Sequence, residues 1–268
     1  MSALDRVVGW LACPHCAASL TLTGAVAHCA SGHAFDVARQ GYLNLSGRHP
    51  PANADTADMV AARERFLASG HYDPISAAVS RRLGNARRVL DVGAGTGHHL
   101  AMVLDAHPDA VGLASDVSVA AARRAARRHP RMASIVADTW VGLPLRPSSV
   151  DALMCVFAPR NASEFFRVLA PGGVVIVVTP DADHLAALRR DHALLQVHPD
   201  KTADVARQLS GLTPIMTQHV GFQADLTGDE VRDLVGMGPN AFHSVAGDLA
   251  ATRIDVSVDV SVFRKPAG

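Results

Sequence analysis

Short apolar runs and segments of helical periodicity alternate along the central part of the chain. The apolar runs lie near residues 88–92, 110–114, 134–137, 149–157 and 174–179, and each has the length of a buried strand. Helical segments such as 162–169 separate them. This order predicts an α/β fold in which helices cover both faces of a doubly wound parallel sheet. The ligand site of such a sheet lies at the carboxyl ends of its strands.

The regions on either side of this core carry weaker patterns. Residues 46–84 predict a helical linker, in which Thr56 or a neighbouring aspartate caps a first helix and a second helix runs over 74–83. From residue 185 onward we expect a helix and the last strands. The alternation of apolar and polar residues over 254–260 predicts one of those strands.

The N-terminal residues carry a candidate metal site. The spacing is C-x2-C, twelve residues, then C-x3-H, formed by Cys13, Cys16, Cys29 and His33. Two such pairs on separate turns can close a tetrahedron around zinc, and a hairpin turning at Gly24 would join them. Four protein ligands leave no open position, so the zinc is expected to be structural.

Two other histidines compete for the fourth position in this interpretation. His15 and His28 lie beside the cysteines, and spacing alone does not separate His28 from His33 as the partner of Cys29. Steric reach favours His33, because adjacent residues seldom chelate one ion.

Composition narrows the class of protein. The chain has 268 residues, 49% hydrophobic and 19% charged, with equal numbers of acidic and basic side chains. Zero net charge gives no global attraction for nucleic acid, although a local basic patch would suffice. No signal peptide or membrane-spanning run is evident, so we expect a cytoplasmic protein whose cysteines stay reduced.

A glycine-rich turn follows the first predicted core strand. The segment reads Asp91-Val-Gly93-Ala-Gly95-Thr-Gly97-His98. A dinucleotide fingerprint G-x-G-x-x-G would need glycine where His98 stands. The pattern D-x-G-x-G-x-G instead resembles motif I of class I methyltransferases, which have a Rossmann-like sheet. That resemblance implies S-adenosylmethionine as cofactor, with Asp91 near its methionine portion.

Two further acids end the next two strands. Asp116 can accept both ribose hydroxyls, as in nucleotide-binding relatives; the alternative is that it caps the helix starting near residue 117. Asp138 stands where the methyltransferase family often contacts the adenine amino group. The expected cofactor-binding residues are therefore Asp91, Gly93, Gly95, Gly97, His98, Asp116 and Asp138.

The whole chain is similar to the 23S rRNA (guanine-N1)-methyltransferases of the RlmA type. The likeness rests on the zinc pattern followed by residues 35–45, and on four further segments: Ala62-Arg63-x-x-Phe66-Leu67-x-x-Gly70-His71-Tyr72, Ala158-Pro159-Arg160-Asn161, Thr179-Pro180 with His184-Leu185, and Met237-Gly-Pro239. The segments 95–100 and 157–161 look closest to the Gram-positive, tylosin-resistance branch. The resemblance implies a zinc-binding, RNA-recognition domain over 1–45, a linker over 46–84 and a methyltransferase domain over 85–268.

This likeness also implies a reaction and partners. The methyl group would go to N1 of a guanine in a domain II hairpin loop of 23S rRNA, and in macrolide producers this contributes to resistance. Family members are often dimers, which implies a homodimer. The leading alternative is a class I enzyme that methylates a small molecule, and another is a binding protein without turnover.

Guanine N1 must lose its proton before it can attack, and a looped-out base needs a surface on which to stack. The catalytic residue stays unassigned, and the candidates are His71, Asp73, Phe157, Pro159 and His184. Tyr72, Phe157 and Phe242 are the candidate stacking surfaces. For RNA contact we favour the cluster Arg39, Arg48, Arg63 and Arg65 over the basic run from Arg123 to Arg131, which we interpret as a solvated helix face.

Overall fold

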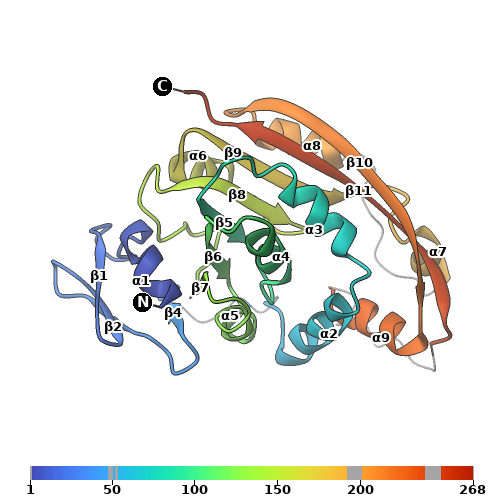
Figure 1. The fold of residues 1–268 in the computed structure, drawn as a ribbon, viewed down its shortest axis with the longest axis horizontal. Helices are drawn as coiled ribbons and strands as arrows, with labels where there is room; N and C mark the ends of the chain where they lie inside the picture. Colours follow the sequence, from blue (N-terminus) through green and yellow to red (C-terminus); the bar gives the residue numbers. More distant parts are fainter. Residues whose placement is uncertain (1, 48–50, 52–53, 192–200, 239–248, 268) are drawn as a thin grey trace.

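The protein is built around one twisted sheet, with a small three-stranded sheet at one end (Figure 1). The computed structural model describes residues 2–47, 51, 54–191, 201–238 and 249–267. Within them the large sheet has eight strands in the order β10-β11-β9-β8-β5-β6-β7-β4, and the small sheet has the order β1-β2-β3. Phe242 and Arg48, named above as candidates, lie outside the described residues.

The five predicted core strands are confirmed and run parallel at the centre of the large sheet. The sheet is mixed, because β11 pairs antiparallel with β9 and β10 antiparallel with β11. The strands of the large sheet are β4 (Tyr42–Asn44), β5 (Arg88–Val92), β6 (Val111–Asp116), β7 (Met132–Val136), β8 (Val150–Val156), β9 (Leu169–Pro180), β10 (Thr213–Leu226) and β11 (Thr252–Arg264).

Helices cover both faces of this sheet, so alternate residues of its buried strands enter two separate hydrophobic clusters. One cluster joins α2, α3, α4 and α9 to residues such as Val89 and Met154, and the other joins α1, α6 and α8 to residues such as Leu90 and Leu153. The α-helices are α1 (Ala3–Val7), α2 (Ala57–Ala68), α3 (Asp73–Ser80), α4 (His98–Ala106), α5 (Val119–Ala125), α6 (Ala162–Val168), α7 (Ala186–Asp191), α8 (Lys201–Gln208) and α9 (Gly228–Gly236).

The two helices predicted in the linker, α2 and α3, form as expected. The Thr56 side chain accepts a hydrogen bond from the backbone N–H of Met59 and so caps α2. Helix α2 packs against α9 and α5, which places it beside the carboxyl ends of the central strands. Among the described residues no helix has both the length and the apolar character that a membrane span requires.

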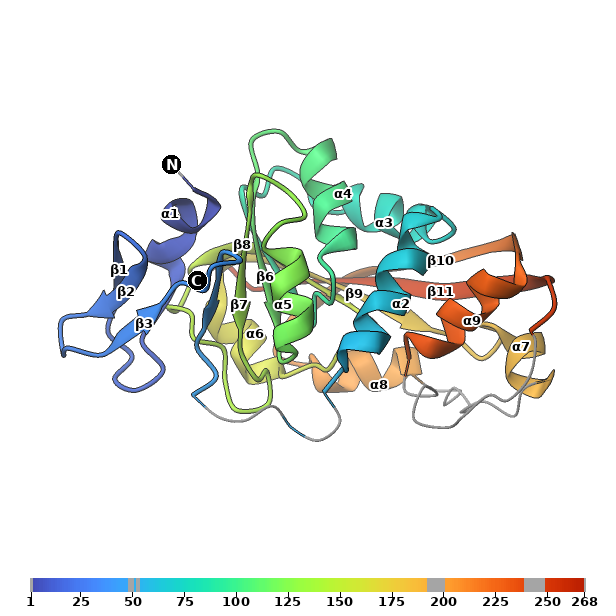
Figure 2. The same ribbon diagram turned by 90° about the horizontal axis from the view of Figure 1, so that it is seen from below.

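The small sheet consists of β1 (Leu20–Thr23), β2 (Val26–Cys29) and β3 (Ala34–Asp36), and Gly24 supplies the left-handed conformation between β1 and β2. The chain segments that precede and follow the small sheet both pack against the large sheet. Before it, α1 and the 3-10 turn η1 (Val8–Trp10) enter the same hydrophobic cluster as β6 and β7. After it, β4 pairs parallel with β7, from Tyr42 opposite Ser134 to Asn44 opposite Val136. Figure 2 shows the small sheet at one end of the molecule and β10 with β11 at the other.

Candidate active site and metal centre

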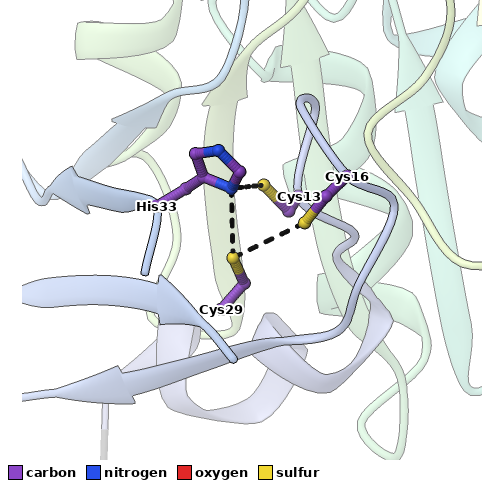
Figure 3. A group of neighbouring side chains, drawn as sticks. All are labelled: Cys13, Cys16, Cys29 and His33. Carbon is purple, nitrogen blue, oxygen red and sulfur yellow. Dashed lines mark hydrogen bonds between the residues drawn. The ribbon is translucent and has the colours of Figure 1, made fainter. Parts of the chain in front are cut away.

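The four predicted zinc ligands converge on one point between the two turns of the small sheet (Figure 3). His33 Nδ1 lies 3.5 Å from Cys13 Sγ and 3.4 Å from Cys29 Sγ, and Cys16 Sγ lies 3.6 Å from Cys29 Sγ. A tetrahedral zinc ion requires edges of about 3.8 Å between two sulfurs and about 3.6 Å between sulfur and nitrogen. The side chains therefore stand close to the geometry that zinc needs, and the donor set fits a structural site.

The competing histidines lie outside this group. His28 Nε2 lies 3.2 Å from Thr21 Oγ1, and the His15 ring packs against His33 and Phe35 with centroids 4.9 and 5.8 Å apart. Thiolates are the form of cysteine that binds zinc, and a hydrogen bond with the Ser31 side chain helps to lower the pKa of Cys16 to about 6. The geometry thus selects His33 as the fourth ligand.

The glycine turn after β5 requires its glycines. Gly93, Gly95 and Gly97 have φ angles of +68°, +55° and +74°, a region that side chains disfavour. A Cβ on Gly93 would lie 2.4 Å from the Cβ of Ala158, and one on Gly97 would lie 2.8 Å from Met132 Sδ. The backbone N–H groups of Gly93 and Ala94 both donate to the carbonyl oxygen of Ser115 on β6, which fixes the turn against the neighbouring strand.

Asp91 is a buried carboxylate with no hydrogen-bond partner among the described residues; it is only 2% exposed. Burial, reinforced by the negative charge of Asp116, raises its pKa well above the ordinary value. An unpartnered buried carboxyl group at the end of β5 fits a site that receives a cation from a ligand. The ammonium group of S-adenosylmethionine is such a cation.

Asp116 holds the turn together from the end of β6. Its carboxylate accepts hydrogen bonds from the backbone N–H groups of Gly95 and Ser118, both at 2.8 Å. The suggestion that Asp116 caps the next helix is wrong, because Ser118 is the N-cap residue of α5 and its hydroxyl accepts from Ala121 N–H. Both carboxylate oxygens of Asp116 thus help to shape the turn, and the binding of a ribose by Asp116 stays a prediction.

The two remaining predicted cofactor residues have partners of their own. Asp138, at the end of β7, accepts a hydrogen bond from Trp140 N–H at 2.9 Å, and the Trp140 side chain is 67% exposed. His98 is buried at the start of α4, with Nε2 3.3 Å from an Asp73 carboxylate oxygen and Nδ1 3.1 Å from Arg128. Burial lowers the pKa of His98. These contacts place His98 in a side-chain network with Asp73 and Arg128.

Three of the candidates for the methyl acceptor side come together. Phe157, directly after β8, has a φ of +54° and is 41% exposed. Its ring centroid lies 5.8 Å from that of His184 and 6.2 Å from that of Tyr72. Ala158 and Pro159 follow it and face Gly93. Tyr72, Phe157 and His184 thus form an aromatic cluster that adjoins the glycine turn after β5.

His71 and Asp73 do not join the aromatic cluster in the described contacts. His71 Nε2 lies 3.0 Å from Glu230 of α9, and Asp73 faces His98. Both side chains make contacts that connect elements of the fold.

Two members of the arginine cluster favoured for RNA contact are engaged in ion pairs, and the role of the cluster in RNA contact stays a prediction. Arg63 forms an ion pair with Asp55, and Arg65 binds the Asp233 carboxylate with two nitrogens, at 2.6 Å and 2.9 Å for the shorter contact of each. Arg39 is exposed on the loop after β3. Arg63 instead lies over Gly95, a placement that sequence reasoning missed although Arg63 belongs to a motif already singled out.

Comparison with known proteins agrees with both parts of this structure. A family model for the RlmA N-terminal zinc ribbon matches residues 11–46, and a methyltransferase-domain model matches residues 89–173. The fold is similar to that of a candidate methyltransferase from Haloferax volcanii solved with the activator Trm112, with a TM-score of 0.57, 16% identity, and coverage of 81% of this chain and 99% of that chain.

Two curated relatives extend over nearly the whole chain. A candidate 23S rRNA (guanine-N1)-methyltransferase of Micromonospora griseorubida is 47% identical over 94% of this chain and 93% of its own. The 23S rRNA (guanine(748)-N1)-methyltransferase of Streptomyces fradiae is 46% identical over 91% of this chain and 90% of its own. The chain therefore belongs to the RlmA-type family of S-adenosylmethionine-dependent 23S rRNA (guanine-N1)-methyltransferases.

Proposed function

We propose that this chain methylates N1 of the 23S rRNA guanine that corresponds to guanine 748, the position named for the Streptomyces fradiae relative. The observation that carries the proposal is the 46% identity with that relative over 91% of this chain, a span that includes both the zinc ribbon and the methyltransferase sheet. A shared methyltransferase domain alone would name the cofactor but leave the acceptor open.

The residues around the glycine turn divide the work of holding the cofactor. Bound S-adenosylmethionine supplies the electrophilic methyl group. Asp116 would accept hydrogen bonds from the ribose hydroxyls, Asp138 would bind the adenine, and Asp91 would pair with the ammonium group. Gly93 and Gly95 let the backbone approach the ligand without a side chain between them.

On the acceptor side, the aromatic cluster offers a stacking surface with polar groups behind it. The exposed ring of Phe157 is the surface for the extruded guanine. The backbone N–H of Ser257 donates to His184 Nδ1 at 3.3 Å. In the neutral ring the proton therefore resides on Nε2, the atom that faces the Tyr72 hydroxyl at 3.5 Å. Burial raises the pKa of Tyr72, which keeps its hydroxyl protonated.

In this arrangement the Nε2–H of His184 points at the Tyr72 oxygen, which leaves the Tyr72 hydroxyl as the donor for the guanine. Donors match the O6 acceptor of guanine and oppose the amino group that adenine carries at the same place. As the N1 proton leaves, negative charge spreads to O6, where a donor stabilises it. His184 is thereby a positioning residue that orients the Tyr72 hydroxyl toward the reacting base, and the N1 proton leaves by a route that does not use His184 Nε2.

The test is methylation of unmodified large-subunit rRNA, freed of protein and taken from a strain that lacks the homologous enzyme. We expect incorporation of labelled methyl and a new primer-extension stop at one domain II hairpin guanine, because N1 methylation blocks Watson–Crick pairing. A stop elsewhere would contradict the assignment of position. No incorporation by protein that binds both cofactor and zinc would favour the small-molecule acceptor that zero net charge mildly supports.

A further inference from the structure

Helix α2 carries a positively charged side chain directly over the cofactor turn. A Cβ added to Gly95 would lie 3.1 Å from Arg63 Nη1 and 3.2 Å from Arg63 Cδ. Gly95 is the middle glycine of the turn, and its N–H donates to Asp116. The Arg63 side chain therefore occupies the edge of the space into which this turn admits a ligand.

The contacts of Arg63 hold its side chain in place and leave N–H donors that can bind another anion. Nη1 is paired with Asp55, and Nη2 donates to the carbonyl oxygen of Met237 at 2.6 Å. The side chains of Arg63 and Asp55 are each 23% exposed, so the pair is not sealed from solvent. A guanidinium group has five N–H donors, and two parallel donors match one carboxylate.

Asp55 is itself anchored beside the turn. Its backbone carbonyl accepts a hydrogen bond at 2.8 Å from the hydroxyl of Ser118, the residue that caps α5. The charge of Asp55 also contributes to raising the pKa of Asp116, after the larger effect of burial. Two carboxylates and one guanidinium thus share a small space at the mouth of the turn.

We propose that Arg63 binds the carboxylate of the amino-acid end of S-adenosylmethionine, taking it in exchange for Asp55. The cofactor ends in a zwitterion, and an anion entering beside two aspartates needs a cation to offset their charge. Arg63 is the cation that the described residues place against a glycine of this turn. In this arrangement Asp55 acts as a counter-ion that positions the guanidinium before the cofactor arrives.

Two ligands that differ only at the amino-acid end of the cofactor can test the role of Arg63. S-Adenosylhomocysteine carries the carboxylate and the ammonium group, whereas 5′-methylthioadenosine lacks both. Loss of an arginine cannot weaken a contact with an ammonium group, because the two cations repel each other. A selective loss of affinity for S-adenosylhomocysteine in an Arg63 variant therefore reports on the carboxylate.

Calorimetry on the full chain provides the test, with Arg63→Met and the matched control Arg65→Met. Arg65 lies on the same helix but binds Asp233 of α9, so its loss removes the same charge without touching the turn. We expect Arg63→Met to weaken S-adenosylhomocysteine binding about tenfold or more, the effect of one charge-assisted contact. Binding of 5′-methylthioadenosine should stay within about twofold in both variants.

Two outcomes would overturn the proposal. Equal weakening of both ligands by Arg63→Met would show that Arg63 only maintains the shape of the turn, and unchanged S-adenosylhomocysteine affinity would show that the carboxylate binds elsewhere. Retained 5′-methylthioadenosine binding also proves that the variant is folded. Because no RNA is present, failure of the proposed rRNA activity would leave this result unaffected, and the two ideas are tested separately.

Discussion

Replacing His33 with alanine should unfold the small sheet while leaving the cofactor site intact. The only fully apolar buried side chains in β1–β3 are Leu20 and Ala27, among the residues described there. A fully buried leucine contributes about 1.5–3 kcal/mol, whereas structural zinc in small domains contributes about 10–16 kcal/mol of apparent folding free energy. The metal is therefore the main source of order in this part of the chain.

The unfolding caused by His33→Ala should be confined to β1–β3, because the segments on either side pack against the large sheet. Leu4, Val7 and Leu11 before the small sheet, and Leu43 after it, are buried against the large sheet. Hydrogen exchange should therefore become fast over β1–β3 and stay slow in α1 and β4. Bound zinc should fall from one ion per chain, with affinity reduced by more than the roughly 10–100-fold that outer-shell changes cause. Cofactor affinity should not change.

The matched control is His28→Ala, which removes an imidazole from the same hairpin but outside the four-ligand group. We expect it to keep zinc and to keep slow exchange in β1–β3. Full zinc occupancy in His33→Ala, or loss of zinc in His28→Ala, would refute the ligand assignment. Loss of cofactor binding along with zinc would refute the view that the large sheet is stable without the metal.

Three further predictions concern the active site. Asp91→Asn should weaken S-adenosylhomocysteine binding and abolish proton release on binding. Burial raises the pKa of Asp91 in the free protein, and the bound ammonium group would lower it again, so the affinity of the wild-type protein should rise with pH below that raised pKa. Calorimetry in buffers of different ionisation enthalpy measures the released proton, and equal proton release by the wild-type protein and Asp91→Asn would contradict this. Gly93→Ala should abolish cofactor binding, since its Cβ would meet Ala158 at 2.4 Å and its φ is +68°. Gly172→Ala, with φ +75° and an open surrounding, should cost only the conformational strain of about 1–2 kcal/mol, so similar cofactor affinities in the two variants would be evidence against a steric role. His184→Leu should lower kcat about 10–100-fold without changing cofactor affinity, and His184→Gln, which keeps an N–H donor, should recover part of that loss; equal rates in the two variants would exclude a donor role.

The features that could be predicted from the sequence are those determined by residues close together in the chain. The strand before Asp91, the glycine turn and the Thr56 cap depend on neighbours within a few residues, and all three form as expected. The zinc ligands were also predictable, because a metal restricts which spacings can close a tetrahedron.

The features that could not be predicted from the sequence depend on contacts between residues far apart in the chain. Arg65 meets Asp233, which is 168 positions away, and no local pattern distinguishes an arginine in such an ion pair from an unpaired one. Strand β4 is only three residues long, and its place in the large sheet depends on pairing with β7, some ninety positions later by the register of Tyr42 with Ser134. The convergence of Phe157 with His184 likewise requires the sheet order.

The pairing of β4 with β7 has a consequence for anyone who shortens this protein. Deleting residues 1–45 would expose the backbone donors and acceptors of β7 along its outer edge, together with the apolar surface that Leu4 and Leu43 now cover. Open edges of this kind recruit other chains and lead to aggregation. A truncated enzyme would therefore lose solubility for reasons unrelated to RNA, and an inactive precipitate would be mistaken for proof of substrate recognition. Point variants at the metal centre are the sound way to ask what the small sheet contributes.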